Sequence, residues 1–111
     1  MAGLPQGDLA IVDLRKLDGY VLDEMHPRGR HKARVFAAAL GLRRADADWL
    51  RSAILAGILG AEAHEESGDR FGDRWRVDLV LIRRGRNARV RTHWLLPADG
   101  SPPRLVTCYV L

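Results

Sequence analysis

Side chains suited to acid–base and phosphate chemistry gather in residues 26–36, which read HPRGRHKARVF. Cleavage of a phosphodiester without a metal ion needs a base for the 2′-hydroxyl, an acid for the leaving oxygen and cations for the developing charge. Histidine, arginine and lysine side chains supply all three. The segment therefore predicts an anion site at which His31 acts as an acid or a base.

The same segment is expected to lie where a loop becomes a helix. The first turn of a helix has unpaired backbone N–H groups and carries the positive end of the helix dipole. Arg28, Arg30 and Lys32 at this point predict a seat for an oxyanion or a phosphate. A structural interpretation stays open, in which His26 belongs to a turn and His31 bonds to the backbone at the start of the helix.

A second polar set lies on the segments predicted as the last two strands. Neighbouring antiparallel strands place side chains of one face about 5 Å apart, so several of them could converge on one ligand. The alternative is a hydrated sheet face with pairs between neighbouring strands. The set contains Arg89, Arg91, Thr92, His93, Thr107 and Tyr109.

Hydrophobic periodicity predicts three helices ahead of the strands, at residues 13–22, 29–40 and 45–60. Gly41 stands in the position of a C-cap and ends the second helix. Because this helix is apolar almost all round, we expect it to be covered on two sides. On the third helix Leu55 and Leu59 point away from the core face, which predicts contact with a second copy or a partner protein.

From residue 61 onward, apolar residues tend to recur at every second position, which predicts strands at residues 61–66, 74–83, 88–96 and 104–111. Arg84-Gly85-Arg86-Asn87 supplies turn residues for a hairpin, and Trp75 and Trp94 are expected in the core. The order predicts an α+β fold, with two to three N-terminal helices packed on one face of a three- to four-stranded antiparallel meander. Residues 1–111 are expected to form one domain with a loosely ordered lead-in at residues 1–10. The free sheet face is then available to Arg74, Arg76, Arg89, Arg91 and His93.

The charge distribution favours an anionic partner such as RNA. The net charge is +4, from 18 Lys and Arg against 14 Asp and Glu, and the positive charge is concentrated in residues 26–51 and 74–91. Such segments suggest a basic face, although the arginine-rich composition alone could produce the same charge. The lone cysteine, Cys108, excludes an internal disulfide and a cysteine-based zinc site. We expect no metal and no cofactor.

No apolar run reaches the length of a membrane span, and the N-terminus lacks the pattern of a signal peptide. The sequence therefore predicts a cytoplasmic protein without a membrane partner.

Three motifs carry a resemblance to a known family. They are HPRGxHKARVF at residues 26–36, RTxW at residues 91–94 and RLVTCYVL at residues 104–111. With these motifs the chain resembles the domain-of-unknown-function family DUF6883, small bacterial proteins without an assigned activity. A looser likeness is to the barnase/EndoU/RelE-like group of metal-independent RNase toxins, which also place helices before an antiparallel sheet. That likeness implies His31 as acid or base, with Arg91, Thr107 and Tyr109 holding the scissile phosphate.

Two functions remain open at this point. One is RNA binding, or a toxin-like metal-independent ribonuclease with a basic anion site at a helix N-terminus. The other is a non-enzymatic interaction module, either immunity-like or antitoxin-like or an accessory homodimer. The first function requires the helix entry with His31 and the sheet face with Arg91 to lie in one cleft.

Overall fold

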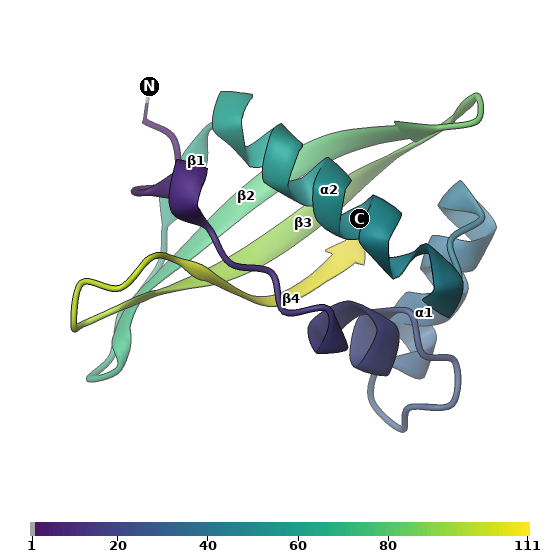
Figure 1. The fold of residues 1–111 in the computed structure, drawn as a ribbon, viewed down its shortest axis with the longest axis horizontal. Coiled ribbons are helices and arrows are strands. Elements are labelled where there is room, and N and C mark those ends of the chain that lie inside the picture. The colour runs from purple at the N-terminus through teal and green to yellow at the C-terminus, as the bar shows by residue number, and fades with distance from the viewer. Residues whose placement is uncertain (1) are drawn as a thin grey trace.

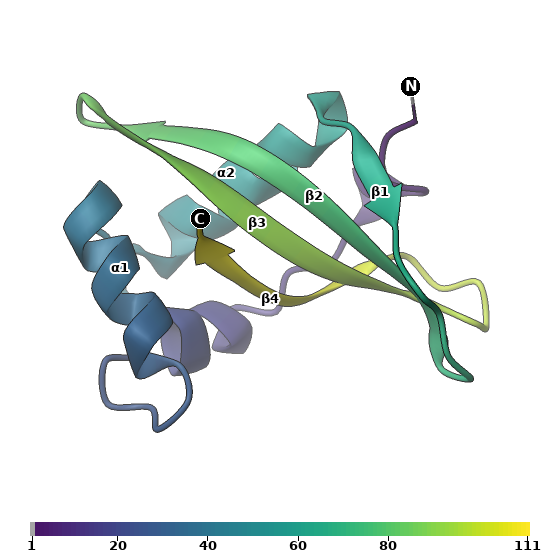
Figure 2. The same ribbon diagram turned by 180° about the vertical axis from the view of Figure 1, so that it is seen from behind.

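The computed structural model describes residues 2–111, which form a sheet with one long helix across a face and another beside the strands (Figure 1). The four strands are antiparallel and lie in the order of the sequence, as a meander: β1 (Ala63–Glu65), β2 (Gly72–Arg83), β3 (Arg86–Pro97) and β4 (Arg104–Val110). Helix α2 (Ala47–Gly57) crosses one face of β2 and β3, and α1 (Arg30–Leu40) lies beside the end of β4 (Figures 1 and 2). The predicted α+β fold is confirmed.

Helix α1 has the predicted extent, and Gly41 ends it in the left-handed conformation with φ of 66°. The N–H of Gly41 donates to the carbonyl of Ala37 at 3.0 Å, as in an αL C-cap. Phe36 is fully buried, whereas Val35 on the other side of the helix is 45% exposed. The prediction that this helix is covered on two sides is therefore wrong, because the sheet and core contact one side only.

Arg83 ties the end of β2 to the end of α1. Its Nη1 donates to the carbonyls of Leu40 at 3.0 Å and Gly41 at 3.1 Å, and its Nη2 lies 3.2 Å from Asp46 Oδ1. The side chain is only 8% exposed. A cation at a helix C-terminus satisfies the last carbonyls and is favoured by the helix dipole. The contact therefore fixes α1 against the sheet.

The segment predicted as a helix at residues 13–22 forms one turn of π-helix at Leu17–Val21, and Leu17 and Val21 are fully buried. The helix predicted at residues 45–60 is confirmed as α2, flanked by short 3-10 turns at Arg44–Asp46 and Ile58–Gly60. The lead-in predicted at residues 1–10 includes Met1, which lies outside the described residues. Within the rest of it, Leu4 is buried and Gly7–Leu9 forms a 3-10 turn.

The two leucines predicted to contact a partner differ in their surroundings. Leu55 packs against the core of its own chain. Leu59 is 63% exposed. Of the two leucines that were expected to point away from the core, only Leu59 is exposed. None of the described helices is both long and apolar enough to cross a membrane.

The core lies between α2 and the inner sheet face, where Trp94 and Cys108 are fully buried. Trp94 Nε1 donates to Thr92 Oγ1 at 2.7 Å, and this hydroxyl donates to the carbonyl of Val77 at 2.7 Å. These bonds satisfy the buried polar groups. Thr92 therefore belongs to the core and is separated from the other polar strand residues. Burial raises the pKa of the Cys108 thiol to about 12, so the thiol stays neutral.

The hairpin turn sets which side chains meet on the outer sheet face. Arg84 and Gly85 both have positive φ, 50° and 79°, as the two-residue turn of a β-hairpin requires. The resulting register pairs Asp78 with Arg91. Between β3 and β4 a bulge at Val106 shifts the register by one residue.

Candidate functional site

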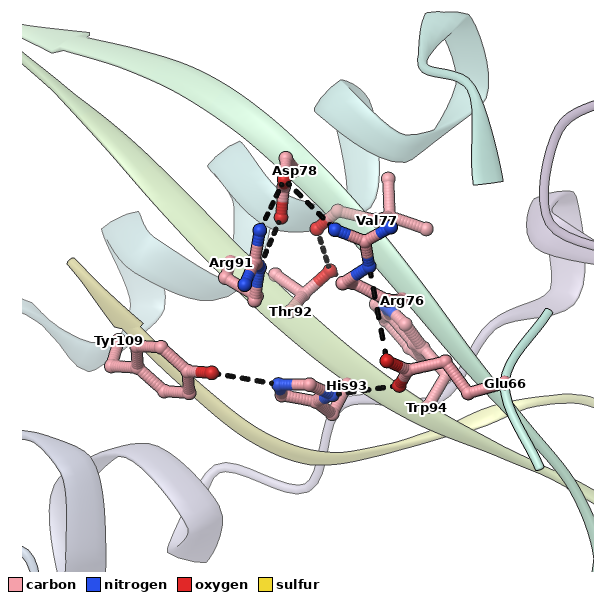
Figure 3. Close-up of polar contacts among 9 residues, drawn as sticks. All are labelled: Glu66, Arg76, Val77, Asp78, Arg91, Thr92, His93, Trp94 and Tyr109. Atoms are coloured by element: carbon pink, nitrogen blue, oxygen red, sulfur yellow. Dashed lines mark hydrogen bonds and ion pairs between the residues drawn. The ribbon is translucent and has the colours of Figure 1, made fainter. Parts of the chain in front are cut away.

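Three side chains from separate segments line up on the open face of the sheet (Figure 3). The Tyr109 hydroxyl lies 3.0 Å from His93 Nε2, and Glu66 Oε1 lies 3.4 Å from His93 Nδ1. A carboxylate at one ring nitrogen orients an imidazole and favours the tautomer that leaves the other nitrogen free to accept a proton. We call Glu66, His93 and Tyr109 the relay. Its geometry suits proton transfer at Nε2.

An ion pair lies directly beside the relay. Arg91 binds Asp78 through both carboxylate oxygens, with Nε–Oδ1 at 2.9 Å and Nη2–Oδ2 at 3.0 Å. The hydrogen bond from Arg91 holds the pKa of the Asp78 carboxyl below its usual value. Asp78 first, and the Tyr109 hydroxyl after it, raise the pKa of Arg91. The Arg91 guanidinium is therefore held in place next to Tyr109.

Arg76 joins the ion pair to the relay. Its Nη1 lies 3.7 Å from Asp78 Oδ2 and its Nε lies 3.9 Å from Glu66 Oε2. The contacts run from Arg91 through Asp78, Arg76 and Glu66 to His93 and Tyr109, as Figure 3 shows. The outer face thus carries a set of neighbouring charges across β2 and β3, in which Arg91 is hydrogen-bonded to Asp78, whereas Arg76 Nε makes no hydrogen bond in the described part of the chain.

The lowered pKa of Asp78 predicts a dependence of stability on pH. A carboxyl whose pKa is depressed in the folded state stabilises the fold above its unfolded pKa of about 3.9, and this stabilisation is lost as the pH falls through the folded value. We therefore expect the free energy of unfolding, from urea titrations, to fall as the pH is lowered below about 4. Asp78→Asn should weaken this dependence, and Asp8→Asn, an exposed control, should keep it. Equal pH dependence in the two variants would contradict the assignment.

Lys32 reaches the same region from the first turn of α1. Its Nζ donates to the Tyr20 hydroxyl at 2.8 Å and lies 5.9 Å from the centre of the Tyr109 ring. Within residues 2–111 no acidic side chain forms an ion pair with Lys32. A cavity of about 350 Å³ opens here, between His31, Lys32, Val35, Tyr109 and Val110. An anion in this cavity would meet an uncompensated positive charge.

Two further cavities meet at the bulge of β4. One, of about 380 Å³, is lined by Glu66, Arg74, His93 and Thr107, among others. The other, of about 690 Å³, also borders Thr107. The Thr107 hydroxyl is buried and has no hydrogen-bond partner in the described part of the chain. Strand β4 is therefore the common wall of three cavities.

The anion seat predicted at the entry of α1 stays a prediction, although three of the backbone amides near it are already paired. His26 Nδ1 accepts the backbone N–H groups of both Arg28 and Gly29 at 3.0 Å, and the N–H of Arg30 donates to the His26 carbonyl at 3.0 Å. These amides are already paired, so they are not available to a phosphate. His26 takes the structural role that the sequence left open, because its ring nitrogen is the nearest acceptor.

The predicted site residues fall into three places around β4. His31 and Lys32 share a cavity with Tyr109, and Arg28 shares one with Thr107. His93 and Arg91 approach the Tyr109 hydroxyl from β3. The helix entry and the sheet face thus meet at Tyr109, but none of these three cavities contains both His31 and Arg91. Arg30 and Arg89 are exposed and do not line these three cavities.

Sequence reasoning missed Glu66, Asp78 and Tyr20. A signal for Asp78 was present, since counting outward from a two-residue turn at Arg84-Gly85 pairs Asp78 with Arg91. Glu66 follows the end of β1 in an irregular segment, where no periodicity predicts the direction of a side chain. The position of Tyr20 depends on the packing of the π-helical turn, and no local sequence pattern predicts this turn.

The comparison with protein families gives a match over nearly the whole chain. The model of the family described as Domain of unknown function (DUF6883) matches residues 3–111. This range includes every residue of the relay, the ion pair and the cavities. No curated protein matches the chain. The likeness to barnase/EndoU/RelE-like toxins finds no support in these comparisons.

Proposed function

We propose that this chain, which belongs to the DUF6883 family, binds RNA and cleaves it at β4 by acid–base catalysis without a metal ion. The observation that carries the proposal is the relay, in which His93 lies between the Glu66 carboxylate and the Tyr109 hydroxyl. Oriented imidazoles next to cations are the groups that this chemistry needs.

The proposed reaction is a transfer of the phosphodiester to the neighbouring 2′-oxygen. His93 Nε2 accepts the proton of the 2′-hydroxyl, and the 2′-oxygen forms a bond to phosphorus as the bond from phosphorus to the 5′-oxygen breaks. His31, which borders Tyr109 from the α1 side, donates a proton to the leaving 5′-oxygen. The products are a 2′,3′-cyclic phosphate and a 5′-hydroxyl, so atoms and charge balance.

The negative charge that develops on the phosphoryl oxygens has two cationic neighbours. Arg91 is fixed beside Tyr109 by Asp78, and Lys32 brings a charge that no acid of the described chain neutralises in an ion pair. Fixed cations stabilise a transition state more than mobile ones because they need no reorganisation during the reaction.

The test is cleavage of matched oligonucleotides in the presence of EDTA. RNA should be cut to products with 2′,3′-cyclic phosphate ends, visible by mass spectrometry. DNA of the same sequence and 2′-O-methyl RNA should remain intact, because they lack the attacking hydroxyl. Intact RNA after long incubation, or equal cleavage of RNA and DNA, would overturn the proposal.

A further inference from the structure

The largest of the three cavities along β4 shares Thr107 with the cavity that contains His93 and Glu66 of the relay. It has a volume of about 690 Å³ and is bounded by residues 13–20, the loop before α1, and the bulge of β4. We call it the Tyr20 cavity. Its lining residues are Asp13, Arg15, Lys16, Tyr20, His26, Arg28, Val106 and Thr107. This volume is in the range of small-ligand sites and much larger than one phosphate needs.

The charge of the Tyr20 cavity is positive. Its acid, Asp13, is neutralised by Arg15, with Nη2–Oδ2 at 2.8 Å and Nε–Oδ1 at 3.2 Å. Lys16 and Arg28 are exposed and form no ion pair with any acid in the described chain. Two uncompensated cations remain, so the cavity favours an anionic ligand.

Two aromatic rings form one side of the cavity. Tyr20 and His26 meet edge to face, with ring centres 4.9 Å apart and planes at 73°. His26 is held by its bonds to two backbone amides, and Tyr20 is held by Lys32. Rings fixed in this way can stack on a nucleobase without losing side-chain freedom. Aromatic rings and free cations together are the chemistry of a nucleotide site.

We propose that the Tyr20 cavity binds a nucleotide beyond the two that flank the scissile phosphate, which makes the substrate a single-stranded polynucleotide longer than a dinucleotide. This inference rests on the proposed function for the place of the scissile bond. Thr107 borders both the Tyr20 cavity and the cavity of His93. A strand that passes over Thr107 therefore reaches the relay with its scissile phosphate and the Tyr20 cavity with a nucleotide beyond the cleaved pair.

The first experiment compares substrates of different length. Lys16→Ala and Arg28→Ala should lower kcat/KM for a hexanucleotide about tenfold each, mainly through KM, since each removes a contact to the nucleotide in this cavity. The loss on a dinucleoside monophosphate, which is too short to fill the cavity, should be much smaller. Arg51→Ala removes an exposed arginine of α2 and is the matched control. Equal losses on both substrates would overturn the inference.

The second experiment does not depend on cleavage. Fluorescence anisotropy measures the binding of a DNA hexanucleotide, which lacks the 2′-hydroxyl, at several salt concentrations. Each of the two variants should reduce the slope of log K against log[salt] by about one, because one phosphate contact is lost. Slopes equal to that of Arg51→Ala would remove the Tyr20 cavity as a nucleotide site even if RNA is cleaved. Reduced slopes without any RNA cleavage would keep the cavity and remove the proposed reaction.

Discussion

His93→Ala is expected to lower kcat for RNA cleavage by about 10²- to 10⁴-fold, the usual contribution of a general acid or base. The substitution removes the nitrogen that lies 3.0 Å from the Tyr109 hydroxyl. His93 is on the open sheet face with its side chain 28% exposed. The free energy of unfolding should therefore change by less than about 1 kcal/mol. Initial rates with a fluorogenic RNA and urea titrations of the same samples separate the two effects.

Three further variants test the separate roles that we propose for Tyr109, Glu66 and His31. Tyr109→Phe keeps the ring that borders Lys32 and removes only the hydroxyl. Glu66→Gln keeps the shape of the side chain and removes the charge that orients His93. His31→Ala tests the proton donor on the other side of Tyr109. A His93→Ala protein with the full rate would refute the assignment of the base, and a fully active His31→Ala protein would assign the acid to another group.

Gly29→Ala should be strongly destabilising, by about 3 kcal/mol, the upper part of the range for overpacking a tight site. A Cβ atom at Gly29 would lie 2.1 Å from the carbonyl oxygen of Tyr20 and 2.8 Å from its carbonyl carbon. Backbone atoms cannot rotate away as a flexible side chain would, so the π-helical turn and α1 must move apart. Urea titration of the purified variant measures the loss.

Gly19→Ala is the matched control, because it changes a glycine of the π-helical turn against which Gly29 packs. A Cβ atom there meets no heavy atom within 4 Å, and the stability should stay within about 0.5 kcal/mol of the wild-type value. Gly29→Ala should also reduce RNA cleavage at temperatures where it is folded, since Tyr20 holds Lys32. Two glycine variants of equal stability would show that the turn does not pack tightly on the entry of α1.

The sequence predicted the fold well where the signal is local. Gly41 ends α1 because a left-handed C-cap needs a residue without a Cβ penalty. Alternation predicted β2 and β3, and the turn predicted at Arg84-Gly85-Arg86-Asn87 is present as the shorter turn Arg84-Gly85. The residues on the outer face of the strands, such as Arg91, His93 and Tyr109, could be grouped for the same reason. Alternation with a period of two predicts which face of the sheet each side chain occupies, but it does not predict which residues that side chain contacts.

The sequence failed where the outcome depends on contacts between distant segments. The turn at Leu17–Val21 is shaped by the burial of Leu17 and Val21 rather than by helix propensity. The bonds from the amides of Arg28 and Gly29 to the His26 ring depend on how the loop before α1 folds back on itself. Glu66 joins the relay only through the path of the chain after β1. Such contacts are tertiary, and no local pattern encodes them.

The bulge in β4 determines which side chains of this strand face the outer side of the sheet. Leu105 and Cys108 both face the core, although three positions separate them, and Thr107 and Tyr109 both face outward. In a strand of strict alternation, a buried Leu105 would carry Thr107 and Tyr109 into the core with it. The bulge takes up one extra residue, Val106, so the residues after it face the opposite side from the one that strict alternation would give them. A regular strand of the same sequence, without the bulge, would present the proposed catalytic side chains Thr107 and Tyr109 to the wrong side of the sheet.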